Sequence, residues 1–209
     1  MRRYLTLTAL CLAAVACHNS DKLEQLNHSF ELGYRALTMP VQERAQPVQL
    51  SRWDSLLKTY RLQLEQTTPH GEQAAQRWQS LQHRLLVFEE QIQAYRQQPA
   101  LYNLGGQCRA VLSQSEQPLE ARLRRIHAQL RKAAPYYRSA RRNLQQFDAE
   151  AAQLGIQKQK MGQRFLRGAL MDSLQIAGLP ADTTQAVRRA AREAARVMQQ
   201  YQSYLAQQE

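Results

Sequence analysis

The feature that most constrains this sequence is a long run of apolar residues separated alternately by four and three positions. The run follows Pro118 and consists of Leu119, Leu123, Ile126, Leu130, Ala133, Tyr137, Ala140, Leu144, Phe147, Ala151 and Leu154. An average spacing of 3.5 residues is typical of helices that pack lengthwise against other helices. Pro135 lacks an amide proton and interrupts the run. We therefore expect one long, kinked helix around residues 118–154.

Apolar residues also recur at three and four positions on both sides of this segment. They predict helices over residues 23–37, 50–64, 75–95, 156–174 and 187–204. Gly155 is expected to separate the long helix from the one after it. No run of alternating β-branched residues predicts a strand.

The predicted fold is all-α, an antiparallel helical bundle of about six or seven helices. Hydrophobic residues make up 44% of the chain, which is enough for a packed core. An extended oligomeric coiled coil is the alternative. The bundle is favoured because Ala133 and Ala140 occupy packing positions with Pro135 between them, and because every apolar stripe then finds a partner.

The N-terminus has the pattern of an export signal. Arg2 and Arg3 precede an apolar run over residues 4–16, which is too short to span a bilayer. The run ends in Ala14-Val15-Ala16-Cys17, which fits both a lipobox and an ordinary cleavage site. We expect a signal peptide over residues 1–16 and acylation of Cys17 by chains such as palmitate. Ordinary cleavage, with release of a soluble protein, is the alternative.

The mature protein is then expected to begin with a lipidated cysteine and short tether at residues 17–19, followed by a single all-helical domain over residues 20–209. Several acyl chains on Cys17 would hold it on a membrane. It would be an exported bacterial lipoprotein of the outer membrane or facing the periplasm, and His18 favours the outer membrane. The sequence identifies neither the oligomeric state nor the ligand.

Cysteine usage excludes an intrachain disulfide in that mature protein. Cys11 leaves with the signal peptide and Cys17 is acylated, so only Cys108 remains as a thiol. A lone thiol cannot form a cysteine-rich zinc site. We expect Cys108 to be a small buried apolar residue. A nucleophile or a cross-link between two copies are the alternatives.

Positive charge is concentrated in one segment. Residues 109–168 hold thirteen Lys and Arg against four Asp and Glu, whereas residues 18–108 hold nine of each. The cations predicted to lie off the apolar stripe are Arg122, Arg124, Arg125, Arg131, Lys132, Arg138, Arg141 and Arg142. Because the protein is exported, we expect no nucleic acid partner. The face would meet another protein or an anionic surface of lipids or glycans, or remain solvated within a larger assembly.

Motifs for catalysis are absent from the sequence. A helical zinc peptidase needs H-E-x-x-H, and the histidines at positions 18, 28, 70, 83 and 127 contain no pair four residues apart. Gly105-Gly106 is interpreted as a turn or a close-packing element rather than a phosphate loop. Glu89 and Glu90 are adjacent, so their side chains diverge on a helix. We expect no enzyme activity, no metal and no cofactor.

Three blocks carry a family resemblance: Pro99–Gly106 (PALYNLGG), Pro118–Leu123 (PLEARL) and Ala134–Leu144 (APYYRSARRNL). In order and spacing they resemble the N-terminal helical region of the bacterial domain-of-unknown-function family 885. The closing helix over Val187–Leu205 resembles the end of that region. Members of the family are long exported proteins, often lipoproteins, that look like zinc-dependent peptidases.

The resemblance implies architecture and no catalytic residue, because the family's H-E-x-x-H helix belongs to a C-terminal half that this sequence lacks. The chain is thus expected to be a shortened relative or a fragment of a longer protein. We expect a membrane-anchored, non-catalytic binding or scaffold domain. One alternative is a subunit of a metallopeptidase whose zinc-bearing half is separate or missing. Another is a module that binds anionic lipids or glycans.

Overall fold

A computed structural model of the chain describes residues 21–39, 41 and 46–207. The regular structure in this part is helical throughout, with no strand, which confirms the prediction of an all-α fold. The predicted signal peptide and Cys17 lie outside the described residues. A helix over residues 21–39 comes first. It is followed by α2 (Leu50–Glu65), α3 (Glu72–Gln97), the short 3₁₀ helix η1 (Pro99–Leu101), α4 (Leu104–Leu112), α5 (Leu119–Leu130), α6 (Ala133–Asn143), α7 (Ala149–Arg167), α8 (Ala169–Ile176) and α9 (Ala181–Ala206).

The helices form two compact units. Unit 1 contains the described residues up to Thr38 together with Leu50–Ile92, and unit 2 contains those of Met39–Gln49 and everything from Gln93 onward. The long helix α3 passes from one unit into the other. The expectation of a single domain over residues 20–209 stays a prediction, because compact units can still unfold together.

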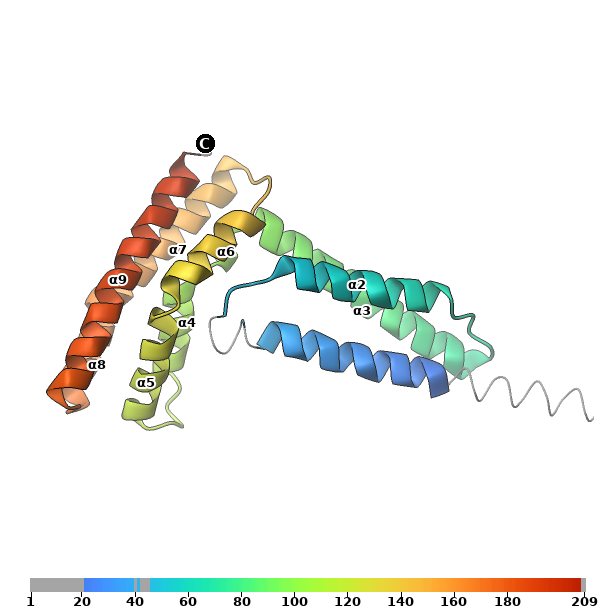
Figure 1. The fold of residues 1–209 in the computed structure, drawn as a ribbon, viewed down its shortest axis with the longest axis horizontal. Helices are drawn as coiled ribbons and strands as arrows, with labels where there is room; N and C mark the ends of the chain where they lie inside the picture. Colours follow the sequence, from blue (N-terminus) through green and yellow to red (C-terminus); the bar gives the residue numbers. More distant parts are fainter. Residues whose placement is uncertain (1–20, 40, 42–45, 208–209) are drawn as a thin grey trace, which may run out of the picture. The chain divides into compact units, whose positions relative to one another are not determined.

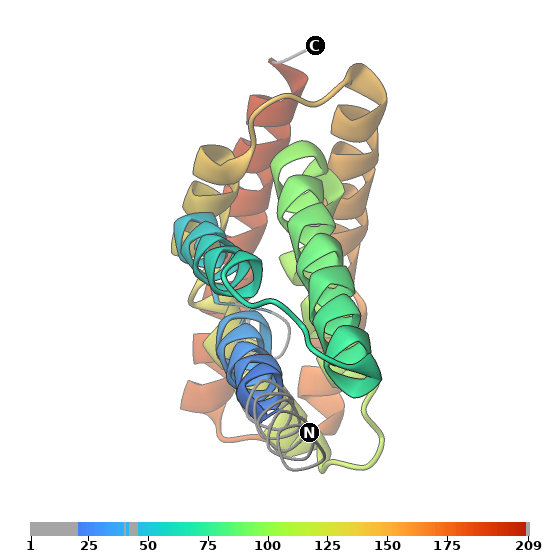
Figure 2. The same cartoon turned by 90° about the vertical axis from the view of Figure 1, so that its right-hand side faces the viewer.

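Unit 1 is an antiparallel arrangement of three helices: the helix at 21–39, α2 and α3 (Figure 1, Figure 2). Its core is aromatic. Phe88 on α3 lies against Phe30, Tyr34 and Trp53, with ring centroids 5.2–6.0 Å apart. Such edge-on and tilted ring pairs add stability beyond the area that they bury. The apolar residues that predicted these helices therefore converge on one cluster.

In unit 2 the chain runs up and down, from α4 to α5–α6, then α7–α8, then α9 (Figure 1). Helix α7 packs along α9 and also against α4. Each helix turns one apolar face inward. Those of α5 and α9 bury Leu123, Ile126, Ala194, Met198 and Tyr201. An antiparallel bundle is thus confirmed in this unit.

Two glycines allow α4 and α7 to approach closely. A Cβ at Gly105 would lie far inside the van der Waals contact distance of the Gly162 Cα, and one at Gly162 would lie 3.1 Å from the Gly105 Cα. Only glycine permits this backbone contact. The close-packing interpretation of Gly105 is confirmed, although the residue lies in a helix that the sequence analysis did not predict.

The segment predicted as one kinked helix, residues 118–154, is instead divided among α5, α6 and the start of α7. Helix α5 ends at Leu130, and Pro135 lies in the first turn of α6. Proline is tolerated in a first turn because its missing N–H would have no intrahelical acceptor there. A second interruption follows Asn143 and lasts until Asp148 caps α7 by accepting a hydrogen bond from the Ala151 amide at 2.7 Å.

This second interruption changes which residues face the core. Up to Leu144 the predicted packing positions are buried or half-buried. Beyond it, Leu154 is 47% exposed whereas Ala152 and Gly155 are buried. Because α7 begins a new helix, the spacing counted from Leu119 no longer applies. Gly155 lies inside α7 and does not end it. The helix ends at Arg167, before Gly168.

Candidate anion-binding groove

An open groove lined by arginines runs along the surface between α9 and the α7–α8 pair, within unit 2. Its volume is about 650 Å³. Arg188, Arg192 and Arg196 line it from α9, and Arg167 lines it from α7. Its apolar lining consists of Leu166, Met171, Ala191 and Ala195, with Gln185 and Gln199 on α9 as the other polar members.

The local sequence of α9 explains why one side of the groove is basic. Val187, Ala191, Ala194 and Met198 are buried against the bundle. Arg188, Arg192 and Arg196 follow one another at four-residue intervals, which on an α-helix places them along one side next to that buried face. Ala191 and Ala195 are too small to fill the space beside them, so the groove remains open.

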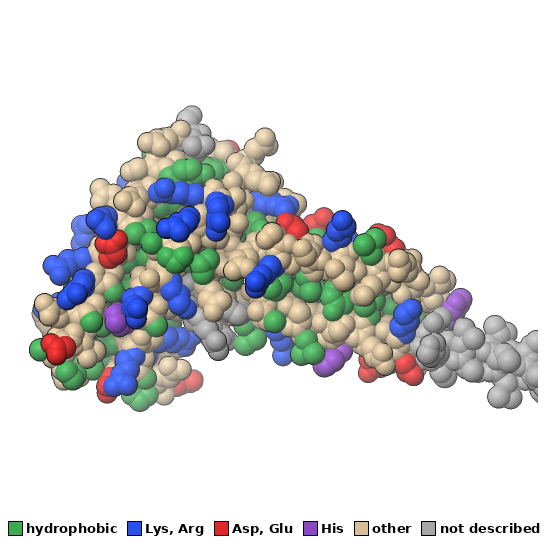
Figure 3. Space-filling model, viewed as in Figure 1, with side chains coloured by type: hydrophobic (Ala, Val, Ile, Leu, Met, Phe, Trp, Pro, Cys, Tyr) green, Lys and Arg blue, Asp and Glu red, His purple; other side chains and the backbone are tan. Residues whose placement is uncertain are grey.

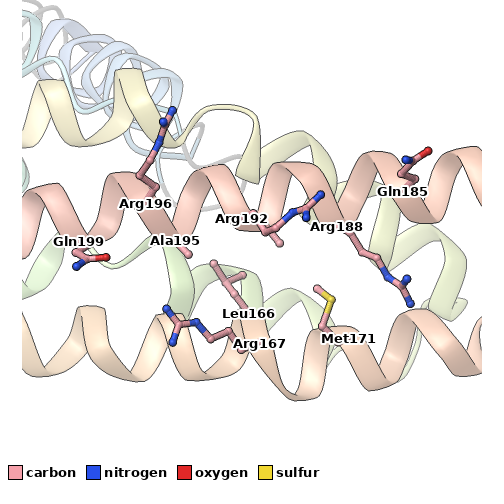
Figure 4. A pocket seen from close by; sticks show the side chains of 10 residues that line it. Leu166, Arg167, Met171, Gln185, Arg188, Arg192, Ala195, Arg196 and Gln199 are labelled. Carbon is pink, nitrogen blue, oxygen red and sulfur yellow. The ribbon is translucent and has the colours of Figure 1, made fainter.

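The opposite side depends on the break between α7 and α8. Gly168 ends α7, and its carbonyl accepts a hydrogen bond from the Met171 amide at 2.7 Å in the first turn of α8. As a result, Arg167 and Met171 both line the groove although they lie on different helices. Figure 4 shows Arg167 and Arg188 extending into the space between the two helical rows, whereas Arg196 extends away from α7.

The electrostatics of the groove are unbalanced. Arg196 donates to both carboxylate oxygens of Glu193, at 2.7 and 2.8 Å, and this bond raises the pKa of the guanidinium. The guanidinium groups of Arg167, Arg188 and Arg192 make no hydrogen bond or ion pair with any described residue. No acidic side chain lines the groove. Guanidinium groups stay charged at any ordinary pH and bind carboxylates and phosphates in pairs of hydrogen bonds. The groove is therefore suited to bind an anionic ligand.

The predicted basic face of residues 109–168 is organised differently from what a single helix would give. Arg122 turns inward and donates to the Leu112 carbonyl, Arg124 pairs with Glu120 at 2.5 Å, and Arg125 donates to Gln114 at 3.1 Å. These bonds lie within the region of α5 and the loop before it. Three of the cations that were expected to face a partner therefore already bind groups within this chain.

The remaining predicted cations lie at the end of α5 and on α6. Arg131, Arg138 and Arg142 are exposed, Lys132 is half-buried, and the Arg141 guanidinium lies 5.3 Å from the centre of the Tyr204 ring. Figure 3 shows several basic side chains close together over the upper part of unit 2 and others scattered below them, with apolar and uncharged surface between. The eight residues therefore do not form one continuous stripe. Burial and the charge of Arg131 lower the pKa of His127, so this histidine adds no charge at neutral pH.

Cys108 is fully buried in α4, which confirms its interpretation as a small buried residue. Its thiol lies 3.4 Å from the Gln129 side-chain oxygen. Burial raises the pKa of the Cys108 thiol to about 12, so it is protonated at neutral pH. Neither a nucleophile nor a cross-link between copies is compatible with this environment.

Within residues 21–39, 41 and 46–207, no group of three or more His, Cys, Asp or Glu side chains is placed to hold a metal ion. Among the described helices, none combines the length and hydropathy needed to cross a membrane. The expectation that the protein has no enzyme activity stays a prediction.

The arginine groove was missed by the sequence analysis because charge was counted over a window. Residues 169–209 hold four basic and four acidic residues and therefore look neutral. The spacing of Arg188, Arg192 and Arg196 was the available signal, since it concentrates positive charge on one side of a helix. The contribution of Arg167 could not be inferred without knowing that α7 packs on α9.

No protein-family model matches the chain, and no curated protein matches it in sequence. Among solved structures it is similar to "a putative lipoprotein of unknown function from Shewanella oneidensis", with a TM-score of 0.64 and 18% identity. The match covers 94% of this chain and 37% of that protein. At this identity the likeness shows the fold alone. The chain spans little more than a third of the neighbour's length, and the resemblance to the domain-of-unknown-function family 885 stays a prediction.

Proposed function

We propose that this chain is an exported, membrane-tethered helical module without a catalytic centre, and that it binds an acidic ligand in the arginine groove. The observation that carries the proposal is the set of three guanidinium groups, on Arg167, Arg188 and Arg192, that share one groove without an acidic partner. Clustered charge of one sign raises the local concentration of oppositely charged ligands and speeds their association.

The tether rests on different observations. Ala14-Val15-Ala16-Cys17 fits a lipobox, and the structural neighbour is itself described as a lipoprotein. Cys17→Ser tests this part. In cells fed a labelled fatty acid, the wild-type protein should carry the label and sediment with membranes, whereas the variant should do neither. Membrane association that survives the substitution would contradict acylation at Cys17.

Binding is tested with a fluorescent short polyglutamate peptide and the mature chain carrying Cys17→Ser. Reversing two groove charges, Arg188→Glu with Arg192→Glu, should weaken binding at least about tenfold, because two favourable charge pairs become repulsive. The control is Arg189→Glu, which reverses one charge at an exposed position of α9 outside the groove, and it is compared with Arg188→Glu alone. The control should retain nearly all affinity at low ionic strength.

Two outcomes would contradict the groove as the site. One is equal loss in the groove variant and the Arg189→Glu control, which would indicate attraction by net charge alone. The other is loss only on reversing Arg138 and Arg142, which would move the site to the predicted basic face. Binding to anionic vesicles that depends on those two residues would favour the lipid-binding alternative.

The second candidate, part of a metallopeptidase, rests on the resemblance to the domain-of-unknown-function family 885, and the match to 37% of a longer protein adds only that a similar fold occurs within a longer chain. It predicts that the chain alone cleaves no peptide and that a separate polypeptide with H-E-x-x-H restores cleavage when both are mixed. Failure of any such product to co-purify with the chain would count against it.

A further inference from the structure

We propose that the occupant of the groove is an acidic amphipathic helix of another polypeptide segment, with carboxylates four residues apart beside an apolar stripe. This inference rests on the proposed function, because it names the ligand of the same groove.

The groove is elongated. Its lining on α9 extends from Gln185 to Gln199, a distance of about 21 Å at 1.5 Å per residue. A phosphate or a single carboxylate would contact one or two arginines and leave most of this length empty. A ligand that fills the groove must therefore be a chain, and a helix of about 14 residues matches the length.

The charges repeat at the pitch of a helix. Arg188, Arg192 and Arg196 follow one another at a rise of about 6 Å. Acidic residues four apart on a partner helix have the same rise, so successive carboxylates can meet Arg188 and Arg192, whereas Arg196 extends away from α7 and must turn to reach a third (Figure 4). Arg196 is held by Glu193 on the exposed surface, and exchanging such a surface pair for another carboxylate costs little.

The lining also distinguishes a helix from an extended segment. The apolar floor for a partner's apolar stripe comes mainly from the half-buried Met171 and Ala195, because Leu166 and Ala191 are almost fully buried. The arginines only donate hydrogen bonds, and the acceptors that line the groove are the amides of Gln185 and Gln199 at its two ends. An extended segment would leave backbone N–H groups without acceptors over this floor, whereas a helix satisfies its own backbone.

A second copy of the chain does not supply such a helix from its described residues. No helix in residues 21–39, 41 and 46–207 carries three acidic residues at successive four-residue intervals. The occupant is accordingly assigned to a different polypeptide segment, recognised as an apolar stripe flanked by regularly spaced acids.

The test compares two helical peptides of identical composition and about 14 residues. In the patterned peptide, three glutamates lie four apart beside a leucine stripe. In the scrambled peptide, the glutamates are distributed around the helix. We expect the patterned peptide to bind the Cys17→Ser chain at least about tenfold more tightly than the scrambled one. Arg188→Glu with Arg192→Glu should abolish the difference and Arg189→Glu should preserve it.

A second variant probes the floor without touching charge. Ala195→Leu places a larger side chain at a half-buried position, so it should weaken the patterned peptide severalfold while polyglutamate binding stays the same. Circular dichroism of the variant establishes that the fold is retained.

The outcomes separate this inference from the proposed function. If both helical peptides and polyglutamate bind equally well, and all depend on Arg188 and Arg192, the groove is an anion site and the helix inference is wrong. Displacement of the patterned peptide by inorganic phosphate at comparable concentration would have the same meaning. If no peptide depends on the groove arginines, both proposals fail.

Discussion

The two units of this protein differ in how they use their arginines. In unit 1, Arg61, Arg77 and Arg84 each form an ion pair with an acid on another helix, namely Glu89, Glu24 and Glu31. In unit 2, the ion pairs Arg124–Glu120 and Arg196–Glu193 lie within single helices, and Arg167, Arg188 and Arg192 form none with the described residues. Three arginines of unit 1 are thus paired between helices, although Arg35 pairs with Glu31 within one helix and Arg52 and Lys58 form no ion pair with the described residues. Binding is assigned to unit 2 because Arg167, Arg188 and Arg192 line one groove there.

The two cores also differ in the polar groups that they bury. Both cores contain ring contacts, around Phe88 in unit 1 and along Tyr102, Tyr136, Tyr137 and Tyr201 in unit 2. Unit 2 buries hydrogen-bonded polar groups. Tyr137 donates to the Gln159 oxygen at 2.5 Å, and the Gln159 amide donates to the Tyr102 carbonyl at 2.8 Å. Desolvation raises the pKa of Tyr137, so the hydroxyl remains a donor at any ordinary pH. Unit 1 depends on apolar volume, whereas unit 2 depends also on specific bonds.

The largest effect is expected from Phe88→Ala, which removes the ring at the centre of unit 1. A truncation of this kind costs about 3–5 kcal/mol in the free energy of unfolding. Both tryptophans of the chain, Trp53 and Trp78, lie in unit 1, so their fluorescence follows this unit while circular dichroism follows all helices. Leu86→Ala, at a 48% exposed position of α3, is the control and should be nearly neutral.

The same experiment tests the prediction of a single domain. If the two signals change together in Phe88→Ala, the units unfold as one domain. A circular dichroism transition that keeps its wild-type midpoint while fluorescence shifts would show that unit 2 unfolds by itself.

A somewhat smaller effect is expected where α4 and α7 touch. Gly105→Ala places a methyl group against the Gly162 backbone and should lower the free energy of unfolding by about 1–3 kcal/mol, because neither helix can move aside freely. The matched change in unit 1 is Gly33→Ala. Its Cβ would lie 2.8 Å from the Leu56 Cδ1, the end of a side chain that can rotate, and alanine favours the helix. Urea unfolding of both variants checks this, and equal destabilisation would contradict the close backbone contact.

Breaking a buried hydrogen bond in unit 2 should lower the free energy of unfolding by an amount in the same range. Tyr137→Phe leaves the Gln159 oxygen without its donor and should lower the free energy of unfolding by about 1–3 kcal/mol. Tyr60→Phe in unit 1 is the control, because the half-exposed Tyr60 contributes a ring contact with Phe30 and no hydrogen bond to a described residue. Comparable losses in thermal unfolding would show that the two cores are alike after all.

The smallest effect concerns the exposed pair between Arg61 and Glu89 in unit 1. The hydrogen bond from Arg61 lowers the pKa of Glu89 below its ordinary value of 4.5. The stability that it contributes is therefore present above the pKa of the unfolded chain and is lost as the pH falls through the folded-state pKa. Glu89→Gln should differ from wild type by less than about 1 kcal/mol at pH 7, since the pair is exposed. In urea titrations the difference should shrink in acid, and a difference independent of pH would exclude this origin.

Much of the helical structure could be predicted from the sequence because helical periodicity is a local property. The stripes containing Trp53, Phe88 and Tyr201 identified both the helices and their buried faces. The prediction failed where a helix ended without a strong signal. The extended residues after Asn143 contain neither proline nor glycine, so the stripe was continued to Leu154. Helix α4 was missed because Gly105-Gly106 has low helix propensity, although Leu104, Cys108 and Val111 have helical spacing and are buried.

From its sequence alone the chain is all-helical, since the spacing of apolar residues determines which face of each segment must be covered. Tertiary structure decided which helices became neighbours. It therefore decided that Gly105 contacts Gly162 and that Arg167 and Arg188 line the same groove. Those residues are distant along the chain, and periodicity carries no information about partners. The groove exists because the packing of α7 on α9 brings Arg167 to the same groove as Arg188 and Arg192, and no local pattern connects residues on different helices.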